Sequence, residues 1–235
     1  IRLKEDGSVI GGFGGTTISA FKNLETGISY KESGIIGGPG NAPAMKMSPV
    51  GLYIDAANDY NLGLLKAKFI GRTTHLDPRS IAMGIVQAYA VYILLQDISR
   101  DKFIDSTLKI CEEYEGQLNQ FFMHHEKGDL KARLKWIKEN KDVDDETAFK
   151  QIKNSSLGFE SYPFSLFMLQ KYWDKPLEGL IETVNFGGDC DTTGAIYGAL
   201  AGAKDGMIFP SSWLDVLDKK DIIIDLATKI HQLKK

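Results

Sequence analysis

Cysteine is scarce in this chain of 235 residues, which contains only Cys111 and Cys190. Two cysteines so far apart match no zinc-ligand spacing and give no disulfide framework. A low cysteine content is typical of reducing compartments, and we therefore expect a cytoplasmic protein. The length is sufficient to bury a hydrophobic core without disulfides or metal ions as staples.

Long apolar runs and an excess of positive charge are also missing. The best candidate run, residues 81–95, is shorter than the ~20 residues that a membrane-spanning helix needs, and it predicts a buried helix instead. The chain has 28 Lys and Arg against 31 Asp and Glu, a formal net charge of −3. We therefore expect neither a membrane partner nor a nucleic-acid-binding surface.

Strand patterns are nearly absent, because no alternating run of β-branched residues is bounded by tight turns. Apolar residues instead recur at helical spacing along most of the chain. The sequence therefore predicts a single all-α domain over residues 1–235. Helices are expected over 16–26, 44–59, 78–95, 103–122, 130–140, 142–152, a stretch after Asp191, 210–216 and 221–234. The apolar and aromatic stretch 162–172 is expected to belong to the core.

Glycine is concentrated in two predicted loops, "GGFGG" (Gly11–Gly15) and "GGPGN" (Gly37–Asn41). A plain turn is the simpler interpretation of each. The alternative is functional: backbone N–H groups ahead of a helix N-terminus can bind phosphate oxygens. A diphosphate bound between two such loops needs no basic side chains, which agrees with the acidic charge balance.

Two aspartates, Asp189 and Asp191, lie in "NFGGDCDTTGAIYGALAGA", after Gly187-Gly188 and before a stretch of small residues. One carboxylate before a helix is ordinary capping. A second one beside it has an electrostatic cost unless a cation lies between them. Carboxylate oxygens with a threonine hydroxyl, here that of Thr192, suit Mg²⁺ or Mn²⁺ better than Zn²⁺.

The helix expected after Asp191 has an unusual content of small residues, including Gly194, Gly198 and Gly202. Each helical glycine costs about 1 kcal/mol relative to alanine. Close approach of a neighbouring helix or of a ligand would offset that cost.

These segments resemble the ADP-ribosylglycohydrolase family, in the family's order, from about Gly12 to Leu217. "NFGGDCDTTGAIYGALAGAKDG" resembles its GGD-x-DT segment and small-residue helix and is the most specific match. "GNAPAMKMSPVGLY", "THLDP", "GFESYPFSLF" and "GGFGGTTISAFKNL" resemble further family segments.

The resemblance implies a compact orthogonal multi-helix bundle that hydrolyses the glycosidic bond between ADP-ribose and an acceptor. The acceptor would be a protein side chain or a small metabolite, and two Mg²⁺ or Mn²⁺ ions would assist. The resemblance implies that Asp189 and Asp191 are catalytic and that these two and Thr192 are metal ligands. It implies that the ADP-ribose lies along Gly37, Gly38, Gly40 and Asn41. Its phosphates would lie near Gly14 and Gly15, and His75 would contact a ribose or the phosphates.

The sequence departs from the family pattern at three places. The family's Thr-Asp-Asp motif and a Gly-Asp element would precede Gly11, where nothing matches them, so we expect an N-terminal part of the domain to be missing from this sequence. Lys46 replaces the usual arginine, which keeps the charge but loses the bidentate fork. Cys190 stands where threonine is common, which should be tolerated.

Two other interpretations remain open. Asp189–Thr193 also satisfies D-x-D-x-T, the motif of haloacid-dehalogenase-type phosphatases, although "VNFGG" before it is a poor strand. The second is a non-catalytic relative that binds ADP-ribose or serves as a crystallin-like structural protein.

Overall fold

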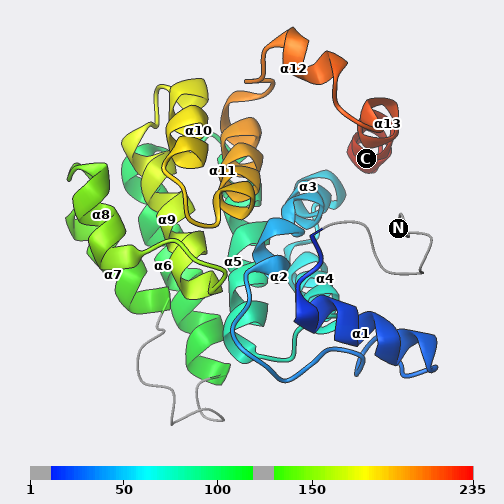
Figure 1. Cartoon of the computed structure of the whole chain (residues 1–235). Helices are drawn as coiled ribbons and strands as arrows, with labels where there is room; N and C mark the ends of the chain where they lie inside the picture. Colours follow the sequence, from blue (N-terminus) through cyan, green and yellow to red (C-terminus); the bar gives the residue numbers. More distant parts are fainter. Residues whose placement is uncertain (1–11, 119–129, 235) are drawn as a thin grey trace.

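The structure is a computed structural model that describes residues 12–118 and 130–234. Within these residues it contains thirteen α-helices and no strand, with only two isolated β-bridges. The prediction of an all-α fold is therefore confirmed (Figure 1). No helix among the described residues is long and apolar enough to cross a membrane.

The helices follow the predicted order closely. They are α1 (Gly15–Glu25), α2 (Ala42–Met45), α3 (Ser48–Ala57), α4 (Tyr60–Arg72), α5 (Pro78–Leu94), α6 (Arg100–Leu118), α7 (Leu130–Glu139), α8 (Asp145–Ile152), α9 (Gly158–Lys171), α10 (Pro176–Asn185), α11 (Cys190–Asp205), α12 (Ser211–Asp215) and α13 (Lys220–His231).

Helix α5 lies at the centre of the bundle and packs against α2, α3, α4, α6, α9 and α11 (Figure 1). It begins as predicted, because the Asp77 side chain accepts a hydrogen bond from the Arg79 backbone N–H at 2.9 Å and Pro78 occupies the first turn. Its surface is apolar nearly all round, and such a helix is stable only when it is buried on every side.

Helix α9 is the second buried helix, and every residue from Gly158 to Gln170 is buried. It contains most of the stretch 162–172 that was expected in the core, and it begins about one turn earlier, with Pro163 inside the helix. The extra turn matters, because it brings Gly158 and Ser161 to the candidate site.

The largest error of prediction is α4, which sequence analysis left out. The N-cap signal is present, and the Asp59 side chain accepts a hydrogen bond from the Leu62 backbone N–H at 3.0 Å. Glycine lowers helix propensity, and α4 contains Gly63 and Gly71. At Gly63 the reason is packing: a Cβ there would lie 2.1 Å from Ile54 Cγ1 of α3.

Two further boundaries differ. The helix expected over 44–59 is two helices, α2 and α3. Pro49 lies in the first turn of α3, where its missing backbone N–H costs no intrahelical hydrogen bond. The helix expected over 103–122 begins at Arg100, and its predicted end lies outside the described residues.

The small-residue helix α11 needs glycine at one end more than at the other. A Cβ at Gly194 would lie 2.7 Å from Val184 Cγ2, so α10 and α11 do approach closely there. A Cβ at Gly202 would meet nothing within 4 Å. The predicted close approach is therefore confirmed for part of the helix only.

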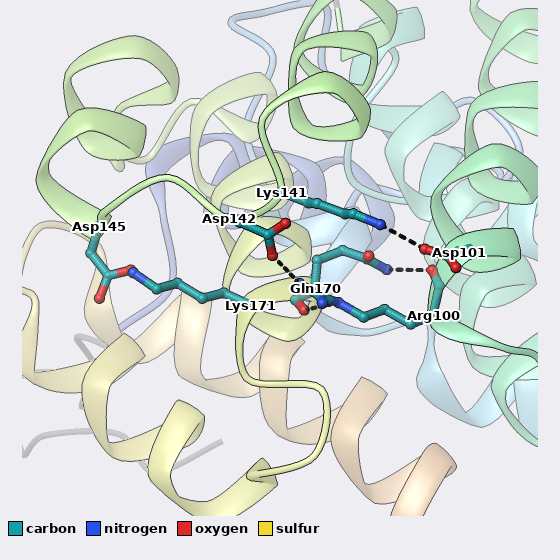
Figure 2. Close-up of polar contacts among 7 residues, drawn as sticks. All are labelled: Arg100, Asp101, Lys141, Asp142, Asp145, Gln170 and Lys171. Atoms are coloured by element: carbon teal, nitrogen blue, oxygen red, sulfur yellow. Dashed lines mark hydrogen bonds and ion pairs between the residues drawn. The ribbon is translucent and has the colours of Figure 1, made fainter.

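A polar clamp holds α6 against α9 and the segment between α7 and α8 (Figure 2). Arg100 donates from Nε to the Gln170 carbonyl at 2.7 Å, and Gln170 returns a bond to the Arg100 carbonyl at 3.2 Å. The outer pairs, Arg100–Asp142 at 2.9 Å and Lys141–Asp101 at 2.6 Å, are more exposed. Exposed ion pairs contribute only about 0–1 kcal/mol each, so the clamp orients these elements more than it stabilises them.

A substitution at Gly51 tests the contact between α3 and α5. A Cβ at Gly51 would lie 2.5 Å from Val91 Cβ and 2.7 Å from the Ala88 carbonyl oxygen, neither of which can move without shifting α5. We expect Gly51→Ala to lower the free energy of unfolding by about 1–3 kcal/mol, in spite of its better helix propensity. Gly202→Ala is the matched control and should raise stability by about 0.5–1 kcal/mol in urea unfolding. Equal effects of the two substitutions would contradict the packing argument.

Candidate active site

Asn41 joins three segments that are far apart in the sequence. Its Nδ2 donates to Asp189 Oδ2 at 2.7 Å and to Ser161 Oγ at 3.0 Å. The side chain is buried, with 8% of its surface exposed. Because an amide nitrogen has two protons, these two bonds use both. The glycine-rich loop, α9 and the start of α11 are thereby fixed relative to one another.

Asp189 occupies the N-cap position of α11, but its side chain makes no capping hydrogen bond. The carboxylate is directed to Asn41 instead. Asp191 accepts one backbone bond, from Thr192 N at 2.8 Å, and is exposed. The capping interpretation is therefore wrong for Asp189, and two carboxylates lie at the positive end of the helix dipole.

The turn before Asp189 requires glycine. Gly187 and Gly188 have φ of 92° and 70°, which side chains rarely adopt. A Cβ at Gly188 would lie 2.4 Å from the Asn154 carbonyl oxygen. Asn154 also donates from Nδ2 to the Gly187 carbonyl at 2.8 Å, so this residue holds the turn that delivers Asp189.

Thr192 is buried, with Oγ1 3.7 Å from the Met45 sulfur. Its role as a metal ligand stays a prediction. Within residues 12–118 and 130–234, no group of three His, Cys, Asp or Glu side chains gathers closely enough to hold a metal ion. Metal ligation by Asp189 and Asp191 likewise stays a prediction.

The two glycine-rich loops lie side by side. A Cβ at Gly37 would lie 3.8 Å from Thr16 Oγ1, which is in the first turn of α1. Gly14 is the N-cap of that helix and Gly15 its first residue. Gly14, Gly15, Gly37 and Gly38 are all exposed. The structure thus places exposed backbone beside a helix N-terminus, an arrangement that favours anions.

The second half of the GGPGN loop is anchored from three sides. The Gly158 N–H donates to the Pro39 carbonyl at 2.7 Å, and Ser80 Oγ donates to the Gly40 carbonyl at 2.8 Å. The third neighbour is His75, whose Nε2 lies 2.8 Å from the position of a Cβ at Gly40. Any larger residue at position 40 would therefore displace the imidazole.

His75 is buried and belongs to a chain of polar contacts. Its Nδ1 lies 2.9 Å from Thr74 Oγ1, to which Lys46 Nζ donates at 2.7 Å. Burial, assisted by the charge of Lys46 and opposed by Asp77, lowers the pKa of His75 to about 4. Burial also lowers the pKa of Lys46 to about 8. The imidazole is thus neutral at physiological pH.

The comparison with protein families agrees with this geometry. A family model described as ADP-ribosylglycohydrolase matches residues 4–235, nearly the whole chain. The chain belongs to the ADP-ribosylglycohydrolase family.

Individual relatives support the assignment. An uncharacterized protein of Archaeoglobus fulgidus is 28% identical over 222 residues, which cover 94% of this chain and 67% of that protein. ADP-ribosylhydrolase ARH3 of Mus musculus is 27% identical over 216 residues, 84% of this chain and 58% of the mouse protein. ADP-ribosyl-[dinitrogen reductase] glycohydrolase of Rhodospirillum rubrum is 62% identical over 42 residues, 17% of this chain and 14% of that enzyme.

The fold has a counterpart among solved structures. An "ADP-ribosylglycohydrolase-related protein complex" superposes with a TM-score of 0.66 at 23% identity, covering 94% of this chain and 70% of the other. This likeness shows a shared helical fold. The chain spans less than two thirds of the mouse relative's length, so its own activity is argued below from its residues.

In this member of the ADP-ribosylglycohydrolase family, the predicted site residues form two adjacent groups. Asn41 brings the aspartate pair to the GGPGN loop, and His75 lies against the same loop at Gly40. Sequence analysis missed four residues that hold these groups in place. They are Thr74, Asn154, Ser161 and Lys46. For Lys46, which was noted as a replacement of the usual arginine, what was missed is its hydrogen bond to Thr74.

The neutrality of His75 can be tested by titration. We expect NMR to show no protonation of this imidazole until the pH falls well below 6.5, towards about 4. In that window the unfolded chain binds a proton that the folded chain excludes, so stability should fall as pH is lowered. A His75→Asn variant should lack this part of the pH dependence. Protonation of folded His75 at its ordinary pKa would contradict the assignment.

Proposed function

We propose that this chain hydrolyses the glycosidic bond between ADP-ribose and an acceptor, either a protein side chain or a small ADP-ribosyl metabolite. One observation carries the proposal: the hydrogen bond from Asn41 to Asp189, which sets the glycine-rich loop against the aspartate pair. Family membership supports the same reaction class, as do the mouse and Rhodospirillum relatives, which are named as an ADP-ribosylhydrolase and an ADP-ribosyl glycohydrolase.

The glycine-rich loops would bind the diphosphate of ADP-ribose. Exposed backbone at Gly14, Gly15, Gly37 and Gly38 offers N–H donors without the entropy cost of ordering long basic side chains. The N-terminus of α1 adds a favourable dipole. Gly40, Asn41 and His75 would then contact the rest of the ADP-ribose.

The aspartate pair would hold Mg²⁺ or Mn²⁺. Two carboxylates and the Thr192 hydroxyl are oxygen ligands of the kind these ions prefer, and neither carboxylate is fully buried. A bound divalent ion supplies Lewis acidity and a water of lowered pKa. Asn41 fixes one oxygen of Asp189, so its orientation does not depend on solvent.

The proposal also includes a cytoplasmic location and no membrane partner. No helix of the described residues is long and apolar enough to cross a membrane. The low cysteine content supports a cytoplasmic location.

The phosphatase alternative is wrong for this chain. That chemistry needs the first aspartate of D-x-D-x-T at the end of a strand, whereas here α10 and the Gly187-Gly188 turn precede Asp189. The non-catalytic alternative predicts binding of ADP-ribose without turnover of ADP-ribosylated substrates, and the experiment below distinguishes it.

Asp189→Asn and Asp191→Asn test the proposed role of the carboxylates. Each is nearly isosteric, so we expect an unchanged fold by circular dichroism. Release of ADP-ribose from ADP-ribosylated peptides, assayed with Mg²⁺ or Mn²⁺, should fall at least about 100-fold. Calorimetry should show the loss of divalent-ion binding.

Asp174→Asn is the matched control, since Asp174 is exposed in the turn before α10. It should retain full activity and metal binding. Unchanged turnover in the Asp189 and Asp191 variants would reject the catalytic roles. Binding of ADP-ribose by a wild-type chain that releases none would support the non-catalytic relative.

A further inference from the structure

The Lys46 side chain is partly buried, and its ammonium is hydrogen-bonded to a hydroxyl. Its Nζ donates to Thr74 Oγ1 at 2.7 Å. Asp77, the carboxylate whose charge acts on His75, is engaged by Arg79 through bonds of 2.8 and 3.1 Å. Burying a charge is costly unless the charged group is hydrogen-bonded. Here the ammonium is hydrogen-bonded to Thr74, which in turn contacts His75.

The direction of the hydrogen bonds follows from the chemistry of the three groups. An ammonium only donates, so Thr74 Oγ1 is the acceptor for Lys46. A hydroxyl has a single proton, and the remaining partner that the structure gives Thr74 Oγ1 is His75 Nδ1, at 2.9 Å. The Thr74 hydroxyl therefore donates its one hydrogen bond to Nδ1 of His75. A neutral imidazole that accepts at Nδ1 carries its proton on Nε2.

We propose that Lys46 is a positioning residue: through the Thr74 hydroxyl, its ammonium holds His75 in the Nε2–H tautomer. The tautomer matters because Nε2 faces the GGPGN loop, 2.8 Å from the position of a Cβ at Gly40. An Nε2–H presents a donor towards that loop, whereas the opposite tautomer presents a lone pair. An anionic phosphate oxygen only accepts hydrogen bonds, so of the two tautomers only the donor suits it.

The proposal deepens the proposed function, since the donor would serve an ADP-ribose oxygen, but the tautomer itself exists without a ligand. The two can therefore fail separately. An Nδ1-protonated His75 would overturn the proposal even if the chain binds ADP-ribose. The expected tautomer in a chain that binds no ADP-ribose would overturn the proposed function alone.

Nitrogen-15 NMR of the full chain, labelled on histidine, tests the tautomer directly. Long-range proton–nitrogen correlations distinguish a protonated ring nitrogen from a bare one, and exposed His231 serves as an internal reference. We expect wild-type His75 to be protonated on Nε2. Lys46→Met should introduce the Nδ1–H form, whereas Lys46→Arg, which keeps a cationic donor, should restore the wild-type pattern.

Lys68→Met, at an exposed lysine of α4, is the matched control and should leave the His75 signals unchanged. If Lys46→Met does not fold, Thr74→Val removes the relay hydroxyl from a nearly isosteric side chain and should give the same change. A wild-type tautomer in either Lys46→Met or Thr74→Val would overturn the role of the relay.

Binding gives a second readout. We expect the Kd for ADP-ribose, measured by calorimetry, to rise about ten-fold in Lys46→Met and in Thr74→Val, the loss of one charge-assisted hydrogen bond. Lys46→Arg should stay near the wild-type value. A purely structural role of Lys46 would weaken binding without changing the tautomer, and that result would also reject the proposal.

Discussion

The hydrogen bond between Asn41 and Asp189 is the contact on which the candidate site depends. It joins the loop after α1 to the start of α11, and the second proton of the same amide reaches α9 through Ser161. Without it the aspartate could return to ordinary capping of α11. One buried amide therefore decides whether the carboxylate serves the helix or a ligand.

The two buried helices explain how such a contact is positioned. Helix α5 is enclosed by its neighbours, and its N-cap Asp77 follows the Thr74–His75 pair after a single residue. Helix α9 is buried along nearly its whole length and presents Ser161 and Gly158 to the glycine-rich loop. Both helices are rigid supports, so the loops on them adopt defined positions without much secondary structure of their own.

Sequence reasoning was reliable where a signal is local. Helical periodicity, the Asp77-Pro78 start and the glycine pair before Asp189 each predicted what the structure shows. It failed where the cause is a distant contact. Helix α4 was missed because the close approach of Ile54 that makes Gly63 necessary is invisible in the sequence, and glycine alone suggests a break.

The site shows the same division. The residue types proposed to bind phosphate and a divalent ion could be named from composition and order, and the resemblance implied their roles. The residues that orient them could not, because Ser161, Asn154 and Thr74 look like ordinary polar residues. The capping interpretation of Asp189 was reasonable from sequence and wrong in the structure, as only the fold reveals that Asn41 competes for the carboxylate.

The distance along the chain between Asn41 and Asp189 has a consequence for folding. They are 148 positions apart, and closing so long a loop is entropically unfavourable until intervening helices have packed. During synthesis, the glycine loop leaves the ribosome long before its acidic partner. The proposed binding of ADP-ribose should consequently be among the last properties that a nascent chain acquires, and it would report completed folding more faithfully than helix content does.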